Sequence, residues 1–252
     1  MEWEVVAEGY RLAEAPTIDI DGSLLFSDVL GGGIYRLSAD GAVREVVPKR
    51  RGVGGIAIHA DGGIVCSGRD VVHVRDGETC TVLHVDGVAG WNDICTDADG
   101  HVYAGALRFA VFDPDAEEVP GELWRVDTGP ILDGIVHANG VAVAGDTIYV
   151  SDTRRQVLVI VEKGQRREID VSSLGHPDGL AIDEHGAVWL ALVSGGIARL
   201  TPAGTVDAHY ERPSAVTTSL CFDGCDLYVT TAGAVLRTTV NVEGMRVAPA
   251  RV

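Results

Sequence analysis

Side chains that carry oxygen recur at one position of a repeat, and they are the first candidates for chemistry in this chain. Two are carboxylates, two are amides, one is a hydroxyl, and a glycine takes the remaining place. In chain order the six positions are Glu14, Gly54, Asn92, Asn139, Asp178 and Thr218. Hard oxygen donors that converge from several segments suit Ca²⁺, Mg²⁺ or Mn²⁺. Without a cation, Glu14 and Asp178 would repel each other in a poorly solvated site.

The spacing of these positions indicates the fold that must bring them together. The intervals are 40, 38, 47, 39 and 40 residues, and the 34 residues after Thr218 together with the 13 before Glu14 supply one more unit. Each unit contains short apolar segments typical of β-strands, several of them preceded by a turn pair such as Asp21-Gly22 or Asp99-Gly100. Four antiparallel strands in about 40 residues is the period of a propeller blade.

We therefore predict an all-β fold, a six-bladed β-propeller with four antiparallel strands per blade, formed by a single domain over residues 1–252. The segment Trp3–Glu8 is expected to supply a strand to the last blade and so close the ring, which removes an exposed sheet edge. The first strand of each propeller blade lines the central channel, so the six positions should form a ring at one depth. A pair of β-sandwiches is the alternative, and evenly spaced four-strand units disfavour it.

Composition excludes several classes of partner. The net charge is −17, and such an acidic surface repels phosphate backbones, so we expect no nucleic-acid partner. No stretch approaches 18 uninterrupted apolar residues, and the N-terminus lacks the apolar core of a signal peptide, so we expect no membrane association. The five cysteines show no CxxC spacing. These features predict a cytoplasmic protein, and they leave its oligomeric state open.

Three of the polar positions also have a simpler interpretation. Asn92-Asp93, Asn139-Gly140 and Asp178-Gly179 are good turn sequences in isolation. Glu14 does not fit that interpretation, because glutamate is a poor turn former and Pro16 follows closely. The common register of all the positions favours a site over a set of unrelated turns.

Several segments resemble the senescence-marker-protein/gluconolactonase family, which includes regucalcin-like members. The ordered set Glu-x-Pro, Asn-Asp, Asn-Gly and Pro-Asp-Gly at blade spacing carries most of this resemblance, which extends over nearly the whole chain. The segments are LAEAP (Leu12–Pro16), WNDICTDADGHVYAG (Trp91–Gly105), ANGVAV (Ala138–Val143), HPDGLAIDEHGAVWLAL (His176–Leu192) and VTTSLCFDG (Val216–Gly224).

The resemblance implies a six-bladed propeller with one divalent cation in its channel. Glu14, Asn139 and Asp178 match the metal ligands of the family. Asn92 matches its substrate-contacting asparagine, and Asp178 also matches its proposed catalytic carboxylate. We expect Ca²⁺, with Zn²⁺, Mn²⁺, Mg²⁺ or Fe²⁺ as alternatives. The family typically hydrolyses sugar lactones, and some relatives act on other lactones or on phosphotriesters.

Two departures from the family concern substrate binding. Regucalcin-like members carry an arginine two places before the asparagine of Asn-Asp, whereas this chain has Gly90 followed by Trp91. The segment Leu107–Gly121, which corresponds to the insertion that covers the channel mouth in the family, also differs. We expect Arg108 to replace the missing cation, and Trp91 and Phe109 to make the mouth more apolar. Packing of the loop on its blade is the alternative for Phe109.

Two histidines complete the candidates for substrate binding. His137 and His176 lie two residues ahead of Asn139 and Asp178, so both could face the channel mouth and touch substrate. The alternative is that each is a solvated loop histidine.

The expected function is hydrolysis of a small-molecule lactone by metal-activated water. Asp178 would act as general base, and Asn92 would orient the carbonyl or steady the charge of the intermediate. This mechanism needs no serine nucleophile, which agrees with the absence of a GxSxG motif from the chain. The alternatives are a phosphotriesterase-like hydrolase on the same metal site, a non-catalytic metal-binding propeller, and an isomerase or cyclase.

Overall fold

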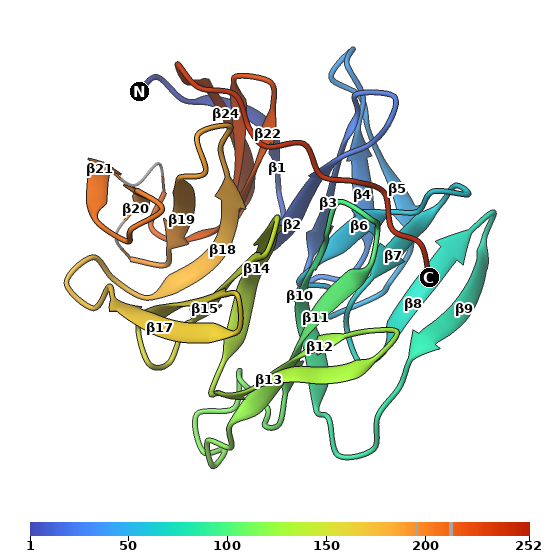
Figure 1. Ribbon diagram of the computed structural model, residues 1–252. Coiled ribbons are helices and arrows are strands. Elements are labelled where there is room, and N and C mark those ends of the chain that lie inside the picture. Colours follow the sequence, from blue (N-terminus) through green and yellow to red (C-terminus); the bar gives the residue numbers. More distant parts are fainter. Residues whose placement is uncertain (195, 212–213) are drawn as a thin grey trace.

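The computed structural model describes residues 1–194, 196–211 and 214–252. These residues form 24 β-strands and no helix, and the strands make six antiparallel sheets of four (Figure 1). No segment in the described ranges is therefore a helix that could cross a membrane. The six sheets confirm the predicted six-bladed β-propeller.

The first three blades follow one another along the chain, each beginning with its innermost strand. The first contains β2 (Ala13–Ile18), β3 (Leu24–Asp28), β4 (Ile34–Leu37) and β5 (Val43–Val47). The second contains β6 (Ile56–Ile58), β7 (Ile64–Cys66), β8 (Val71–Arg75) and β9 (Glu78–Leu83). The third contains β10 (Gly90–Thr96), β11 (Val102–Leu107), β12 (Gly121–Arg125) and β13 (Gly129–Ile135).

The last three blades repeat this order, except that the sixth takes its outer strand from the N-terminus. The fourth contains β14 (Ala138–Ala144), β15 (Thr147–Asp152), β16 (Val157–Glu162) and β17 (Gln165–Asp170). The fifth contains β18 (Pro177–Ile182), β19 (Val188–Leu192), β20 (Gly196–Leu200) and β21 (Val206–Tyr210). The sixth contains β22 (Thr217–Asp223), β23 (Asp226–Thr231), β24 (Ala234–Thr239) and β1 (Glu4–Glu8).

The ring closes through two sets of contacts. The innermost strands contact one another in blade order, and β22 returns to β2. The Thr218 hydroxyl on β22 donates a hydrogen bond to the Ala13 carbonyl on β2, at 2.7 Å. At the outer edge, β1 pairs with β24, where Glu4 faces Arg237. The N-terminal strand therefore completes the sixth blade, as the sequence predicted.

The burial of the strands explains their sequences. The second strand of a blade lies between two neighbouring sheets, so β3, β11 and β19 are buried at every position and read as short, nearly continuous apolar runs. The outer strands β5 and β9 are largely exposed and carry charged and polar residues. The core is thus a set of apolar layers between adjacent blades, such as the layer in which Leu25 and Ile34 meet Val53 and Ile56.

β-Bulges mark the repeated position in five of the six innermost strands. The pairing with the second strand shifts between Glu14 and Thr17, Trp91 and Ile94, Ala138 and Val141, Pro177 and Leu180, and Thr217 and Ser219. A bulge breaks the alternation of a strand and re-aims the side chains within it. Five positions of the predicted ring therefore lie at bulges. The sixth position, Gly54, lies just before β6.

The glycines that follow the ring residues do not form turns. Gly140 and Gly179 lie inside β14 and β18, and neither has a positive φ. A Cβ atom on Gly140 would lie 2.5 Å from the Asp178 carbonyl, and one on Gly179 would lie 2.1 Å from the Ser219 hydroxyl. These glycines allow neighbouring innermost strands to approach closely. The turn interpretation of the Asn-Gly and Asp-Gly pairs is therefore wrong.

The C-terminal segment crosses the end of the propeller that lies opposite to the ring of polar residues (Figure 1, red trace). The backbone N–H groups of Met245, Ala250 and Arg251 donate to carbonyls of Ile182, Ile58 and Gly100, at 2.8, 2.6 and 2.8 Å. Ile58 and Ile182 end β6 and β18, whereas the ring positions lie at or before the beginning of their strands. The C-terminal segment therefore joins three blades at the end of the channel opposite to the ring.

Closure by β1 leads to a testable prediction. Ala7 is 8% exposed and packs among buried residues of the first and sixth blades, whereas Val5 on the same strand is 55% exposed. Ala7→Asp would bury an unpaired carboxylate and should cost roughly 2–4 kcal/mol. Thermal denaturation should show a Tm lower by roughly 5–15 °C. Val5→Asp is the matched control and should change Tm little; equal effects of the two substitutions would contradict closure through this strand.

Candidate functional site at the channel entrance

The structure brings the predicted ligands together. Glu14, Asn139 and Asp178 lie at the bulges of three innermost strands, and their side chains are more than 90% buried. The carboxyl groups of Glu14 and Asp178 are close enough to perturb each other. A Cβ atom at Gly54 would lie 2.2 Å from Oδ1 of Asn92, so the glycine of the second blade makes room for this amide.

Burial dominates the electrostatics of the ring. It raises the pKa of Glu14 well above its usual value, and the nearby Asp178 carboxylate raises it further. The Ala15 N–H, which donates to Glu14 Oε2 at 2.7 Å, offsets part of this rise. Burial likewise raises the pKa of Asp178, followed by repulsion from Asp93, and a hydrogen bond with Asn139 partly offsets it. The folded protein therefore holds two carboxyl groups where ionisation is costly.

Asp93 is a third carboxyl group at the ring, and the sequence analysis did not assign it a role. Its oxygens accept hydrogen bonds from the backbone N–H groups of Ile94 (2.8 Å) and Val141 (3.1 Å), so it ties β10 to β14. Burial raises the pKa of Asp93 to about 7. Strand alternation turns the neighbour of an inward-facing residue outward, but the bulge at Trp91–Ile94 removes that alternation. The only signal in the sequence that Asp93 belongs to the ring was its position next to Asn92.

The donor set fits a hard divalent cation. Asp178 Oδ1 is buried without a hydrogen-bond partner among the described residues. No cationic side chain in the described ranges lowers the pKa of Glu14, Asp93 or Asp178. All the available donors are carboxylate or amide oxygens, which suit Ca²⁺ and similar ions. A cation at this point would satisfy the orphaned oxygen and reverse the repulsion among the carboxylates.

Asn92 and His137 lie next to each other beside the ring. Asn92 Nδ2 donates to the Ala138 carbonyl at 3.2 Å and lies 3.4 Å from Nε2 of His137. Burial lowers the pKa of His137 to about 4, with a further contribution from the Arg154 guanidinium. His137 is therefore neutral at pH 7, and its buried Nδ1 has no partner among the described residues. Two polar groups are thus available to hydrogen-bond a substrate.

His176 occupies a different environment. Its side chain is exposed, and Nδ1 lies 3.2 Å from the Thr153 carbonyl. The structure places it at the surface of the entrance rather than against the ring. A contact between His176 and substrate stays a prediction.

The structure does not bring the other predicted substrate residues against the ring. Trp91 is 1% exposed and packs edge-on against Trp124, with ring centroids 5.6 Å apart. The Arg108 guanidinium forms a two-pronged ion pair with Glu122, at 2.9 and 3.0 Å. Phe109 is 6% exposed and lies under the guanidinium of Arg154. Roles for Trp91, Arg108 and Phe109 in substrate binding stay predictions, and Arg154 is a cation of the entrance that the sequence analysis did not single out.

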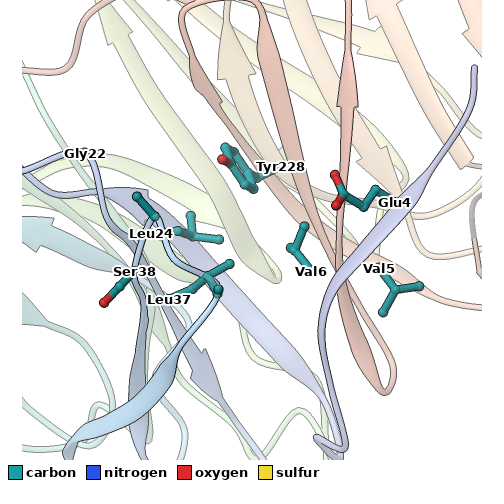
Figure 2. A pocket seen from close by; sticks show the side chains of 10 residues that line it. Glu4, Val5, Val6, Gly22, Leu24, Leu37, Ser38 and Tyr228 are labelled. Atoms are coloured by element: carbon teal, nitrogen blue, oxygen red, sulfur yellow. The ribbon is translucent and has the colours of Figure 1, made fainter.

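Two other features lie away from the ring. Asp97, Asp99 and His101 cluster at the turn after β10, where Asp97 accepts hydrogen bonds from within its own turn and from Tyr103. A groove of about 230 Å³ lies where β1 meets the first blade, and Figure 2 shows Val5, Val6 and Tyr228 along it. Neither feature collects buried carboxyl groups from several blades as the ring does.

Comparison with known proteins agrees with this geometry. The model of the SMP-30/gluconolactonase/LRE-like region matches residues 12–233, which include every bulge of the ring. The chain belongs to this family. The resemblance predicted from the ordered motifs is therefore confirmed.

Relatives and solved structures extend the comparison over almost the whole chain. The pentonolactonase XacC of Haloferax volcanii is 26% identical, covering 91% of this chain and 84% of its own. Regucalcin of Xenopus laevis is 27% identical, covering 90% and 85%. The structure of a luciferin-regenerating enzyme superposes with a TM-score of 0.87 at 20% identity, covering 100% and 99%. This last similarity is one of fold.

The buried carboxyl groups predict an unusual dependence of stability on pH. Glu14, Asp93 and Asp178 have pKa values raised above their unfolded values of about 4, so folding takes up protons above that pH, and for Asp93, whose pKa is raised to about 7, this uptake extends to about pH 7. Protein treated with a chelator should therefore become less stable as pH rises from about 5 to about 8, with a fall in Tm of about 5 °C or more. The lowered pKa of His137 makes the protein more stable as pH rises to about 6.5, which opposes the effect of the carboxyl groups. The net effect is a loss of stability, because one histidine is set against three carboxyl groups.

Thermal denaturation across this pH range, with chelator and with saturating Ca²⁺, measures the effect. Asp93→Asn should reduce the slope in chelator, because it removes one of the three groups. A Tm in chelator that stays level or rises between these pH values would show that burial does not raise the pKa values of these carboxyl groups as the structure indicates.

Proposed function

We propose that the protein is a hydrolase that opens lactones with water at the channel entrance. The observation that supports this most is the convergence of buried carboxyl and amide oxygens from separate blades, with Asp178 Oδ1 left unpartnered. The chain also belongs to a family with relatives named pentonolactonase and putative sugar lactone lactonase. The substrate class is therefore a small cyclic ester, with sugar lactones first.

We assign the cation to Glu14, Asn139 and Asp178. Ca²⁺ is the preferred ion because all the donors are hard oxygens, and Zn²⁺, Mn²⁺, Mg²⁺ and Fe²⁺ are the alternatives. When bound, such a cation polarises the ester carbonyl and lowers the pKa of water. Asn139 Nδ2 donates to the Thr153 hydroxyl at 3.2 Å, an interaction that leaves its amide oxygen available as a ligand.

Asp178 would carry the proton. With one oxygen of its carboxylate on the cation, the other can accept a proton from the water that attacks the carbonyl carbon, and the carboxyl group can then return that proton to the ring oxygen as the ester bond breaks. The lactone and one water thereby become one hydroxy acid. A cation against this carboxylate would keep it ionised despite its burial, and an ionised carboxylate is what a base requires.

Asn92 and His137 would position the substrate. One N–H of Asn92 donates to the Ala138 carbonyl, and the other, on a nitrogen 3.4 Å from His137 Nε2, would turn to the carbonyl oxygen of the substrate as it gains negative charge. The neutral imidazole of His137 can hydrogen-bond a substrate hydroxyl without adding charge.

We also propose that residues 1–252 act as one domain, because the first strand of the chain completes the last blade. A cytoplasmic location stays a prediction from composition.

The function is tested by a panel of sugar lactones and phosphotriesters assayed in parallel, with acid release followed in a pH-stat. Asp178→Asn at saturating Ca²⁺ should lower kcat on the best lactone on the order of 10²–10⁴-fold, the range for loss of a general base. A variant that keeps near-parental kcat would show that Asp178 is not the base. Turnover of phosphotriesters alone would support the phosphotriesterase alternative, and turnover of neither class would support a non-catalytic propeller.

Metal binding is tested separately by calorimetric titration with Ca²⁺. Glu14→Gln removes a charged ligand and should weaken binding on the order of tenfold or more. Asp99→Asn is the matched control, because it removes a carboxylate from the acidic cluster at the far end of β10. Binding that weakens in Asp99→Asn and not in Glu14→Gln would place the ion in that cluster instead.

A further inference from the structure

The loop between β11 and β12 begins beside the candidate site. Residues 108–120 join these strands, and the pairing of β11 with β10 sets Leu107 opposite Gly90 and Ala106 opposite Trp91. The loop therefore leaves the third blade at the level of Asn92. The loop that follows β15 has the same relation to the fourth blade, because Asp152 pairs with Ala138, the residue before Asn139.

Few interactions hold the outer part of the loop. Residues 109–120 form two internal hydrogen-bonded turns, from Asp113 to Ala110 and from Ala116 to Asp113. In the part of the chain that the structure describes, the hydrogen bonds and ion pairs that join this segment to other elements all run to Arg154 on the loop after β15. The preceding residue, Arg108, is held within its own blade by Glu122.

Arg154 contacts the segment at three points. Its guanidinium lies over the ring of Phe109, 5.9 Å from the centroid. Nη2 donates to the Val111 carbonyl at 3.4 Å, and Nε lies 3.3 Å from a carboxylate oxygen of Glu118. Two of the points, Phe109 and Val111, lie at the beginning of the segment, and the third, Glu118, lies near its end. One side chain of the fourth blade thus fixes a loop that belongs to the third.

The same side chain lies close to the candidate site. The positive charge of Arg154 contributes to the lowered pKa of His137, which lies 3.4 Å from Asn92. The loop and its anchor are therefore adjacent to the two polar groups that would position substrate. The neighbouring Arg155 makes no hydrogen bond or ion pair with the described residues of this segment, because its guanidinium turns to Glu168 on the outer strand β17.

We propose that Arg154 is the positioning residue that latches the 109–120 loop across the third and fourth blades at the channel entrance. This inference rests on the proposed function in one respect only, that the entrance admits the substrate. The latched loop limits which substrates reach Asn92 and His137. Arg154 itself does not touch the reacting atoms.

Hydrogen–deuterium exchange on the full-length protein tests the latch without any assay of activity. Arg154→Ala removes a cation–π contact, a hydrogen bond and an ion pair, so exchange of peptides from residues 109–120 should accelerate on the order of tenfold. Arg155→Ala is the matched control, since it removes the same charge from the same loop and leaves the three contacts intact. Unchanged exchange in Arg154→Ala, or equal acceleration in both variants, would overturn the latch.

Kinetics then test what the latch does. For a small and a bulky lactone, Arg154→Ala should raise KM on the order of three- to tenfold, reduce the preference between the two, and change kcat less than twofold. Ca²⁺ affinity should not change. Faster exchange with unaltered KM and substrate preference would overturn the positioning role. If the parent protein hydrolyses no lactone, the proposed function fails, while the exchange experiment still decides whether the latch exists.

Discussion

The burial of carboxyl groups close together at the ring is the constraint on which the rest of this structure depends. Glu14, Asp93 and Asp178 come from three blades, and no cationic side chain of the described chain offsets their charge. Such a cluster persists only where the surrounding backbone holds it in place. The innermost strands do so by approaching so closely that Gly140 and Gly179 leave no room for a side chain. The stability of the apolar layers between blades therefore offsets the free-energy cost of burying these carboxyl groups.

Hydroxyl groups reinforce this arrangement. A bulge leaves backbone N–H and C=O groups without partners in the neighbouring strand. Serine and threonine hydroxyls near the ends of the second strands form hydrogen bonds with such groups. Ser151 donates to the Asp178 carbonyl of the next blade, and Ser67 accepts from the N–H groups of Gly54 and Gly55. Thr230 accepts from the Ser219 N–H in the sixth blade. The serine and threonine residues at these places thus serve the ring as well as the packing.

The repeat made the blades and the ring predictable, because each depends on local spacing. Glu14, Asn139 and Asp178 were found in this way, since their common register survives whatever the loops do. Asp93 was not found, because a bulge overrides strand alternation and leaves no trace in composition. Trp91 was expected at the mouth, but the same bulge leaves it packed on Trp124. Arg108 pairs with Glu122 across its own hairpin. Arg154 contacts a loop of a different blade, and no local sequence pattern reveals such a contact.

The pairing of β1 with β24 also governs the order in which the molecule assembles. Five blades are built from strands adjacent in the chain, so their strand pairings close only short loops. The sixth must wait for β24, because Glu4 meets Arg237 from almost the opposite end of the chain. Joining ends so far apart costs more loop-closure entropy than any local strand pairing, so we expect this pairing to form last. It is also the step that brings the first blade, with Glu14, against the sixth. The candidate site is thus completed last, and a cation or a proton that neutralises its carboxylates would favour the closed ring over an open arc of blades.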